Sequence, residues 1–314
     1  MAIIGRVALP LAVALPLLAL LILIAISRSL RPLSNLSRAV AQRSADHMSP
    51  LILDEVPDEA RPLVQSLNNL LERLRHSLEA ENRFTADAAH ELRTPLAVIR
   101  AQAQVAQAST DEAERSRALA SIVEGADRAT RLAVQLLTLA RAEHDAPLPD
   151  TPVDLGEVAR ACIASRAETA LQRQQQLSLR QHGVCIVKGQ IDLLEALCGN
   201  LIDNALTYVP EGGRIEIQVT AAASSVQLRV IDDGPGVSKD DRERLLHRFY
   251  RAPGAQGSKT ALDGSVSPRT KAQGSGLGLA IVRQIAQRHQ ALLQLTEGLE
   301  GRGLGVTVTF SQPR

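Results

Sequence analysis

The sequence predicts a multidomain chain: a transmembrane helix, an antiparallel helical hairpin that dimerises into a four-helix bundle, and an α/β-sandwich domain. Three observations support this prediction. Residues 7–26 carry no charged side chain. From Leu63 to Ala140, apolar residues recur at spacings of three and four, the period of amphipathic helices. Beyond residue 150, strand-like alternation is interspersed with helical segments, which is typical of a sheet covered by helices.

The composition narrows the classes of function. The chain has 314 residues and a net charge of +1, with 35 basic and 34 acidic side chains. This balance gives no reason to expect direct binding of nucleic acid. The three Cys residues lack CxxC spacing, so we expect small core residues in a reducing compartment. Aromatic residues make up 2% of the chain, so small aliphatic side chains must fill the core.

Residues 1–27 are predicted to form a transmembrane segment. The stretch VALPLAVALPLLALLILIAI at 7–26 would span about 30 Å as a helix, the thickness of the hydrocarbon layer, and membrane helices tolerate its prolines. A cleaved signal peptide is the alternative, but the run is long for one and no small-residue cleavage site follows. Four arginines follow it before any acidic residue: Arg28, Arg31, Arg38 and Arg43. We therefore expect a single-span protein of the inner membrane with its later domains in the cytoplasm.

Two long amphipathic helices are predicted between residues 63 and 143. The first has an apolar seam of Leu63, Leu67, Leu70, Leu74, Leu78, Phe84, Leu92, Leu96 and Ile99, and the second has one of Ile122, Ala126, Ala129, Ala133, Leu136 and Ala140. A break is expected at 106–114, with Ser109 or Thr110 as N-cap. One hairpin cannot bury both seams, so we expect a homodimeric bundle. A monomeric hairpin with a half-exposed seam is the alternative.

A mixed α/β domain is predicted after a Pro-rich linker at 144–152. Asp154 and Glu157 resemble a capping box at a helix start. Strands are expected at 176–180, 183–187, 214–220, 225–232, 291–298 and 305–310, the third and fourth of them as a hairpin, and helices at 191–208, 241–250 and 276–289. Residues 252–274 are rich in Gly, Ser, Lys and Thr, which predicts a long flexible loop.

Three clusters in this domain carry chemistry. Asn200 and Asn204 are four residues apart and share a helix face, where they either cap and pack or offer amide oxygens to a Mg²⁺ that holds phosphates. Asp232 begins the sequence DDGPG after a strand. It is either part of a plain turn or an acceptor for an adenine amino group, with Gly234 and Gly236 allowing close approach.

The third cluster is GSGLGLAIV at 274–282. A Gly-rich backbone that leads into a helix start is typical of an anion site. It lacks the spacing of the dinucleotide fingerprint, and GAQGSKT at 254–260 has Ser258 where a P-loop needs Gly. Both of those nucleotide motifs are therefore excluded.

One further stretch, AAHELRTPLAVIR at 88–100, raises the question of a reactive histidine. It begins like the zinc-protease motif HExxH, but Thr94 replaces the second ligand. Pro95 removes a helical N–H, so the carbonyl of Glu91 loses its partner, which predicts a bendable turn at His90. Four other histidines are predicted to be ordinary surface residues: His76, His144, His182 and His289.

Taken in order with FTADAAHELRTPLAVI at 84–99, these clusters resemble a sensor histidine kinase over nearly the whole chain. The resemblance implies four parts. They are the transmembrane segment at 1–27, a HAMP-like linker and signalling helix at 28–80, a dimerisation and histidine phosphotransfer domain at 81–145, and a catalytic ATP-binding domain of the Bergerat type at 150–314. It also implies a homodimer and a response regulator as partner.

The resemblance implies roles for individual residues. His90 would take a phosphoryl group from MgATP and pass it to an Asp of the regulator, Glu91 would act as acid or base, and Thr94 would serve in dephosphorylating the regulator. Asn204 would bind Mg²⁺. ATP would be held by a larger set: Asn200, Asn204, Tyr208, Asp232, Gly234, Gly236, Phe249, Arg251, Gly274, Gly276 and Gly278.

Several features depart from the expected pattern. Thr207 stands where the family has a basic residue, which puts one phosphate contact in doubt, and Asn200 stands where related ATPases place a Glu for water attack. Asn200 at this position favours transfer to a side chain over hydrolysis. Thr207 leaves a catalytically degenerate, membrane-tethered scaffold, which binds nucleotide or a partner without phosphotransfer, as the alternative. Only six residues precede the apolar run, so a missing sensor domain and first span also remain open.

Overall fold

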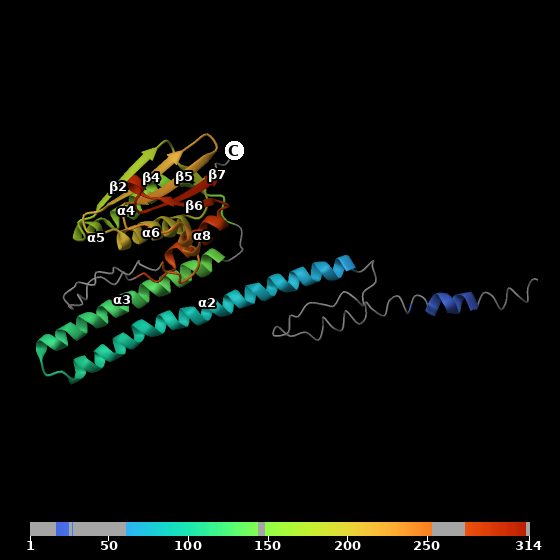
Figure 1. Ribbon diagram of the computed structural model, residues 1–314, viewed down its shortest axis with the longest axis horizontal. Coiled ribbons are helices and arrows are strands. Elements are labelled where there is room, and N and C mark those ends of the chain that lie inside the picture. The colour runs from blue at the N-terminus through green and yellow to red at the C-terminus, as the bar shows by residue number, and fades with distance from the viewer. Residues whose placement is uncertain (1–16, 25–26, 28–60, 144–147, 253–273, 312–314) are drawn as a thin grey trace, which may run out of the picture. The chain divides into compact units, whose positions relative to one another are not determined.

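The computed structural model describes residues 17–24, 27, 61–143, 148–252 and 274–311. Two compact units divide the chain at Ala86 and Asp87 (Figure 1). Most of the predicted transmembrane segment and all of 28–60 lie outside the described residues. Within the described ranges, no helix is both long enough and apolar enough to cross a membrane. The predicted span is therefore described only at 17–24, which are helical and exposed.

Two long helices form the predicted hairpin. Helix α2, Arg61–Ala108, has 48 residues and continues through Pro95, and α3, Glu112–Glu143, has 32 residues. The break between them falls inside the expected range, but neither expected residue is the N-cap. Asp111 has that role, because its carboxylate accepts a hydrogen bond from the Ala113 amide at 3.1 Å. Ser109 instead bonds the Asp111 amide and Glu114.

The buried stripe of α3 differs by one position from the predicted seam. Four of its five buried residues recur every seven positions, namely Ala118, Gly125, Leu132 and Leu139, and the fifth is Ala142. Gly125 lies against α2, where an added Cβ would come within 2.8 Å of Ile99 Cγ1. Ala126, Ala133 and Ala140 of the predicted seam are exposed in the single chain. A single hairpin therefore leaves these three alanines unburied, and their burial in a dimeric bundle stays a prediction.

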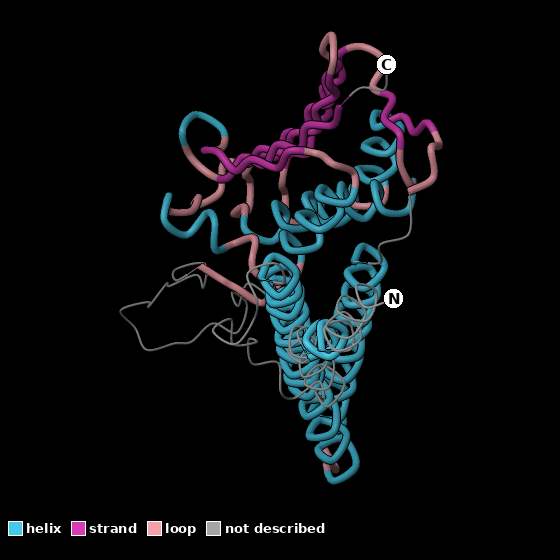
Figure 2. The backbone as a smooth tube through the Cα atoms, turned by 90° about the vertical axis from the view of Figure 1, so that its right-hand side faces the viewer, coloured by secondary structure: helices cyan, strands magenta, loops and turns pink. Residues whose placement is uncertain are grey.

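The α/β domain is built on a five-stranded mixed sheet in the order β2-β4-β5-β7-β6. Its strands are β2 Gln176–His182, β4 Arg214–Ala221, β5 Ser225–Asp232, β7 Leu304–Ser311 and β6 Leu292–Glu297. Strands β2 and β4 are parallel, and the other neighbours are antiparallel. Helices α4 Leu155–Ala164, α6 Ile191–Tyr208 and α8 Gly278–Arg288 cover one face of the sheet (Figures 1 and 2).

Most elements agree with the predictions. The helix at 191–208 has the expected bounds, and the 214–232 hairpin is antiparallel as expected. The helix expected at 241–250 is wrong in extent, because α7 covers only Lys239–Arg244. Three short elements were not predicted: β1 Pro152–Asp154, which pairs with β3 Ile186–Lys188, α5 Ala167–Gln172, and a 3₁₀ turn at Leu299–Gly301.

The start of α4 shows half of the predicted capping box. Asp154 accepts a hydrogen bond from the Gly156 amide at 2.7 Å, as an N-cap should. Glu157 does not reach back to the cap, because its carboxylate pairs with Arg160 at 2.7 Å. The helix start is therefore fixed by the aspartate alone.

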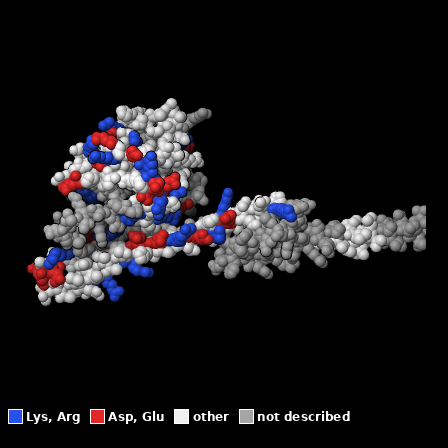
Figure 3. Space-filling model, in the orientation of Figure 1, with Lys and Arg blue, Asp and Glu red and all other residues white. Residues whose placement is uncertain are grey.

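Small aliphatic side chains fill the core, as the composition predicts. Strand alternation puts Ile215, Ile217 and Val219 of β4 fully inside, opposite the buried face of α6. Charged side chains of both signs are interspersed on the face that Figure 3 shows. Some charged side chains of the α/β domain are paired across elements, such as Arg214 with Asp233 and Glu300.

His289, predicted to be a surface residue, is half-buried at the end of α8. Its Nδ1 lies 2.8 Å from the Ile285 carbonyl, and its Nε2 accepts a bond from the Gln190 amide at 3.4 Å. This arrangement needs a neutral ring with the proton on Nδ1. Burial, with a smaller contribution from Arg288, lowers the pKa of His289 below 6.5.

We expect acidification to destabilise this domain through His289. The unfolded chain takes up a proton near pH 6.5 and the folded chain only at lower pH, so stability is lost as the pH falls through that window. In thermal unfolding of the full chain, His289→Gln should reduce the loss of stability on going from neutral to acidic pH. His182→Gln, at an exposed position of β2, is the control. Equal pH slopes in the two variants would contradict this role of His289.

Candidate active site

Helix α6 presents two asparagines on one partly exposed face. The Asn200 Nδ2 donates to the Ala196 carbonyl at 2.7 Å, which turns its Oδ1 toward the start of α8. An added Cβ at Gly278 would lie 3.4 Å from that oxygen. The half-buried Asn204 makes no side-chain hydrogen bond to another described residue, so its amide oxygen is available to a ligand.

Asp232 lies at the end of β5 and is the buried acceptor of the site. Its Oδ1 accepts hydrogen bonds from the amides of Gly234 at 2.9 Å and Leu304 at 3.1 Å. Burial raises the pKa of this carboxyl, and the two amide donors partly oppose that shift. No bond to its Oδ2 is recorded among the described residues. The second oxygen can therefore accept a hydrogen bond from an amino group.

Each glycine of the 274–278 run lies against a different predicted site residue. An added Cβ would come 3.1 Å from Tyr208 Oη at Gly274, 2.7 Å from the Phe249 carbonyl carbon at Gly276, and 3.4 Å from Asn200 Oδ1 at Gly278. Gly234 lies beside the same residues, since an added Cβ there would come 3.4 Å from the Tyr208 carbonyl oxygen. The fold thus brings both glycine motifs onto α6.

Phe249 and Gly276 join the two ends of the predicted loop. The Phe249 amide donates to the Gly276 carbonyl at 2.9 Å. Both residues have positive φ, 59° and 72°, which glycine adopts without strain and phenylalanine does not. Arg251 is exposed at the edge of the described residues. Residues 253–273 lie outside them, so the predicted flexible loop is not described.

The start of α8 fits a phosphate group. Its N-cap position, Leu277, supplies no side-chain cap, so the first amides of an 11-residue helix lack that partner. Unpaired amides and the helix dipole favour an anion at this end. A Mg²⁺ beside such phosphates would fit the neutral amide oxygen of Asn204. No group of three or more His, Cys, Asp or Glu capable of holding a metal occurs among the described residues.

The predicted phospho-acceptor lies on α2, away from this cluster in sequence. His90 and Thr94 are exposed and Glu91 is half-buried. The Thr94 hydroxyl donates to the His90 carbonyl at 3.4 Å, so the two residues share one helix face. No hydrogen bond or ion pair is recorded between these residues and the α6 cluster within the described ranges.

The sequence prediction missed the turn that supports Asp232. An added Cβ at Gly298 or Gly303 would come within 2.1 Å of the Asp232 carbonyl oxygen, and Leu304 supplies an amide to its carboxylate. Four glycines between 298 and 305 were the available signal. Ser275 was also missed. Its hydroxyl lies 2.7 Å from Gln135 Oε1 of α3.

The comparisons with known families agree with this geometry. Residues 189–314 match the family described as histidine kinase-, DNA gyrase B-, and HSP90-like ATPase. Residues 80–145 match the His Kinase A phospho-acceptor domain, and 30–76 match the HAMP domain of PhoQ-like sensor proteins. The α/β domain is therefore an ATP-binding domain of the type shared by histidine kinases, gyrase and HSP90.

Two relatives extend the similarity to longer proteins. The sensor protein kinase PmrB of Pseudomonas aeruginosa is 43% identical over 301 residues, which cover 95% of this chain and 60% of PmrB. The sensor protein BasS of Salmonella typhimurium is 31% identical over 282 residues, which cover 89% of this chain and 73% of BasS. The chain belongs to the sensor histidine kinase family.

A solved structure supports the fold. The histidine kinase ThkA, in complex with response regulator protein TrrA, matches with a TM-score of 0.60 and 19% identity, covering 76% of this chain and 64% of that chain. At this identity the likeness concerns the fold alone. The chain spans about three fifths of the length of PmrB.

Asp232→Asn should weaken ATP binding by roughly 10- to 100-fold, because a hydrogen bond to a charged acceptor is worth about 1.5–3 kcal/mol. Titration of the full chain with a fluorescent ATP analogue measures this. In the wild type, binding should weaken as the pH falls through the raised pKa of Asp232, because protonation removes the charged acceptor.

Asp233→Asn is the matched control for this measurement. The Asp233 carboxylate already accepts bonds from the Arg214 amide and guanidinium, so its charge is used within the fold. Its replacement should leave ATP affinity nearly unchanged. Similar losses in both variants would contradict a specific adenine contact at Asp232.

Proposed function

We propose that this chain phosphorylates itself on His90 with MgATP and transfers the phosphoryl group to an Asp of a response regulator. The observation that carries the proposal is the meeting of the amide face of α6, the buried Asp232 and the uncapped start of α8 in one place. An exposed histidine on a separate helix then supplies the acceptor. The proposed chain has four parts: a transmembrane segment at 1–27, a HAMP-like linker and signalling helix at 28–80, a dimerisation and histidine phosphotransfer domain at 81–145, and a catalytic ATP-binding domain at 150–314.

The nucleotide is held by groups of three kinds. Asp232 accepts the adenine amino group, while Gly234 and Gly236 let the base approach the backbone. Asn200, Tyr208 and the glycines at 274, 276 and 278 line the phosphates, with Phe249 and Arg251 at the start of the loop over them. Bound Mg²⁺ would neutralise phosphate charge. Asn204 is the residue that would hold it.

The transfer step uses the imidazole of His90. A neutral imidazole nitrogen is a competent nucleophile near neutral pH. Glu91 takes or orients the proton on the other ring nitrogen. Amides at the start of α8 stabilise the negative charge that remains on the nucleotide phosphates.

The same helix face supports removal of the phosphoryl group from the regulator. Thr94 lies one turn after His90, and its hydroxyl reaches the His90 carbonyl. A regulator docked with its phospho-Asp at His90 would bring that group next to Thr94. The hydroxyl can then hold a water molecule for hydrolysis.

The protein acts as a membrane-embedded homodimer in this proposal. Large apolar side chains remain exposed on the hairpin: Leu96, Val98, Val105, Leu119, Val123, Val134 and Leu137. A second hairpin would cover them and complete a four-helix bundle. A single span at 7–26 would place the remainder at the cytoplasmic side of the inner membrane. No direct contact with nucleic acid is needed.

His90→Gln should abolish labelling of the full chain by γ-³²P-ATP, because glutamine offers no nucleophilic ring nitrogen. ATP binding should stay within about twofold of the wild type, since the substitution lies outside the α6 cluster. His76→Gln, on an exposed part of the same helix, is the control and should label normally. Label that survives in His90→Gln would refute the assigned acceptor.

Thr94→Ala should lose most regulator dephosphorylation and keep self-phosphorylation, because the hydroxyl is needed only to hold water. The two rates are measured separately, with labelled chain and with labelled regulator. Thr85→Ala provides a control, since the Thr85 hydroxyl also bonds a carbonyl four residues back on α2. Equal loss of both activities in Thr94→Ala would count against this role.

A degenerate scaffold is the second candidate function. Its support is Thr207, which stands where the family has a basic residue. The Thr207 hydroxyl donates to the Asp203 carbonyl at 2.7 Å, so this position of α6 offers no positive charge to a phosphate. A scaffold would bind ATP without incorporating label. The labelling assay therefore separates the two functions directly.

A further inference from the structure

Helix α6 brings no positive charge to the nucleotide face. Its sequence, IDLLEALCGNLIDNALTY, contains acidic residues but no Lys or Arg. The outward side of the helix near the site carries Asn200, Asp203, Asn204 and Thr207. A triphosphate keeps net negative charge even with Mg²⁺ bound. Phosphates on this face therefore need basic side chains from other elements.

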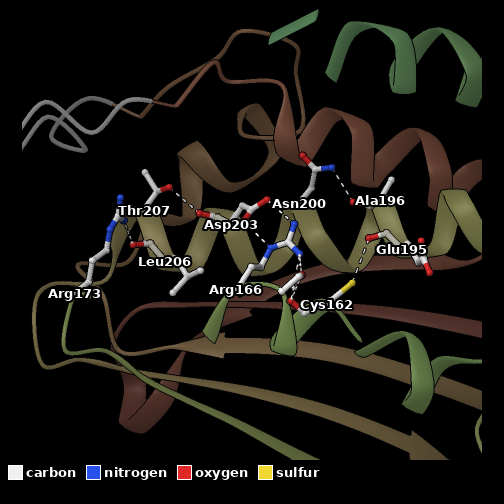
Figure 4. Close-up of polar contacts among 10 residues, drawn as sticks. Cys162, Arg166, Arg173, Glu195, Ala196, Asn200, Asp203, Leu206 and Thr207 are labelled. Carbon is white, nitrogen blue, oxygen red and sulfur yellow. Dashed lines mark hydrogen bonds and ion pairs between the residues drawn. The ribbon is translucent and has the colours of Figure 1, made fainter. Parts of the chain in front are cut away.

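Two arginines reach α6 from neighbouring segments (Figure 4). Arg166, just after α4, bonds both carboxylate oxygens of Asp203 at 2.7 and 2.9 Å, and this pairing offsets its charge. Arg173, which follows α5, donates from Nη1 to the Leu206 carbonyl at 2.6 Å. No carboxylate pairs with Arg173 among the described residues. Of the two guanidinium groups, that of Arg173 is therefore the one available to an anion.

Pro210 explains why an arginine binds at this point of the helix. One more helical turn would give the Leu206 carbonyl a bond from the amide of residue 210, but proline has no N–H. The buried Gln175 also serves this end of α6, because its Nε2 donates to the Leu206 and Val209 carbonyls at 3.2 and 2.6 Å. The Leu206 carbonyl thus has two donors. Loss of the Arg173 side chain leaves the end of α6 still bonded.

Arg173 is placed to reach the phosphate side of α6. Around the outward side of the helix, Thr207 lies between Asp203 and Asn204. Arg173 is exposed and binds the carbonyl of the residue just before Thr207 (Figure 4). The Thr207 side chain is short, and its hydroxyl is turned back to the Asp203 carbonyl. It therefore leaves space for the guanidinium to extend toward Asn204.

We propose that Arg173 binds a phosphate of ATP and supplies the positive charge that α6 lacks. One guanidinium N–H stays on the Leu206 carbonyl and fixes the side chain, while the others donate to phosphate oxygens. This contact rests on the proposed function of the α6 face as the nucleotide site. Arg173 is then a binding residue from a segment that carries no nucleotide motif.

Arg173→Gln tests the contact, because it removes the charge and keeps a neutral donor. The affinity of the full chain for ATP, with Mg²⁺ present, should fall about tenfold. The affinity for adenosine should stay unchanged, because adenosine has no phosphate. Equilibrium dialysis with radiolabelled ATP and radiolabelled adenosine measures both. An unchanged ATP affinity, or equal losses for ATP and adenosine, would overturn the proposal.

Two lysine variants separate charge from packing. Arg173→Lys keeps the charge and should retain most of the ATP affinity. Thr207→Lys, added to Arg173→Gln, places a charge beside the lost one and should restore much of the affinity. Low ATP affinity in both lysine variants would contradict a role of charge.

Arg160→Gln is the matched control for the loss of one positive charge. Arg160 is an exposed residue of α4 that pairs with Glu157 at 2.7 Å, so its charge is used within the fold. This variant should bind ATP like the wild type. A loss equal to that of Arg173→Gln would assign the effect to the net charge of the domain and refute a local contact.

The salt dependence of binding gives a second readout. Added salt should weaken ATP binding more steeply in the wild type than in Arg173→Gln, because ions screen the charge that the variant lacks. Equal salt dependence in the two proteins would refute the charge contact.

The outcomes for this contact and for the proposed function are separate. ATP binding that depends on Arg173, with no label on His90, would refute the proposed phosphorylation and support the contact. Normal labelling of His90, with unchanged ATP affinity in Arg173→Gln, would refute the contact and support the proposed function.

Discussion

A buried carboxylate needs donors, and the way Asp232 obtains them organises the α/β domain. Two backbone amides, from Gly234 and Leu304, bond one of its oxygens. The Leu304 amide reaches it only because the chain at Gly298 and Gly303 approaches Asp232 so closely that no side chain fits. The end of β5 is thereby joined to the connection between β6 and β7. The other carboxylate oxygen stays available to a ligand at a fixed position, which makes the site preorganised.

Helix α6 serves two purposes on its two sides. One side presents Asn200 and Asn204 at the candidate site. On the other side, the Glu195 carbonyl lies 3.6 Å from Cys162 Sγ of α4 and Asp203 pairs with Arg166, just after α4. Because a helix is rigid over this length, the position of the amides depends on how the far side packs. The Arg166 guanidinium fits across the helix only because position 199 is glycine. This packing explains why a small residue sits in the middle of a helix, where it otherwise costs about 1 kcal/mol.

Local patterns predicted most of the helices and strands and most of the residues that meet at the candidate site. The bounds of α6 follow from its apolar period, and the glycine motifs indicate their own turns. What failed depends on contacts between distant segments. The parallel pairing of β2 with β4 has no local signal, and the support of Asp232 comes from a turn some seventy residues later. The buried stripe of α3 includes Gly125, which the apolar pattern ignores, and an added Cβ there would come within 2.8 Å of Ile99 Cγ1 of α2.

The bond between Phe249 and Gly276 has a consequence for how such a chain can vary. It holds both ends of the intervening segment at the site, whatever lies between them. The entropy of closing a loop grows only with the logarithm of its length, by roughly 0.6 kcal/mol per doubling. Insertions and deletions between these two residues therefore cost little free energy. The length of this segment can differ between related proteins while the residues of the candidate site keep their geometry.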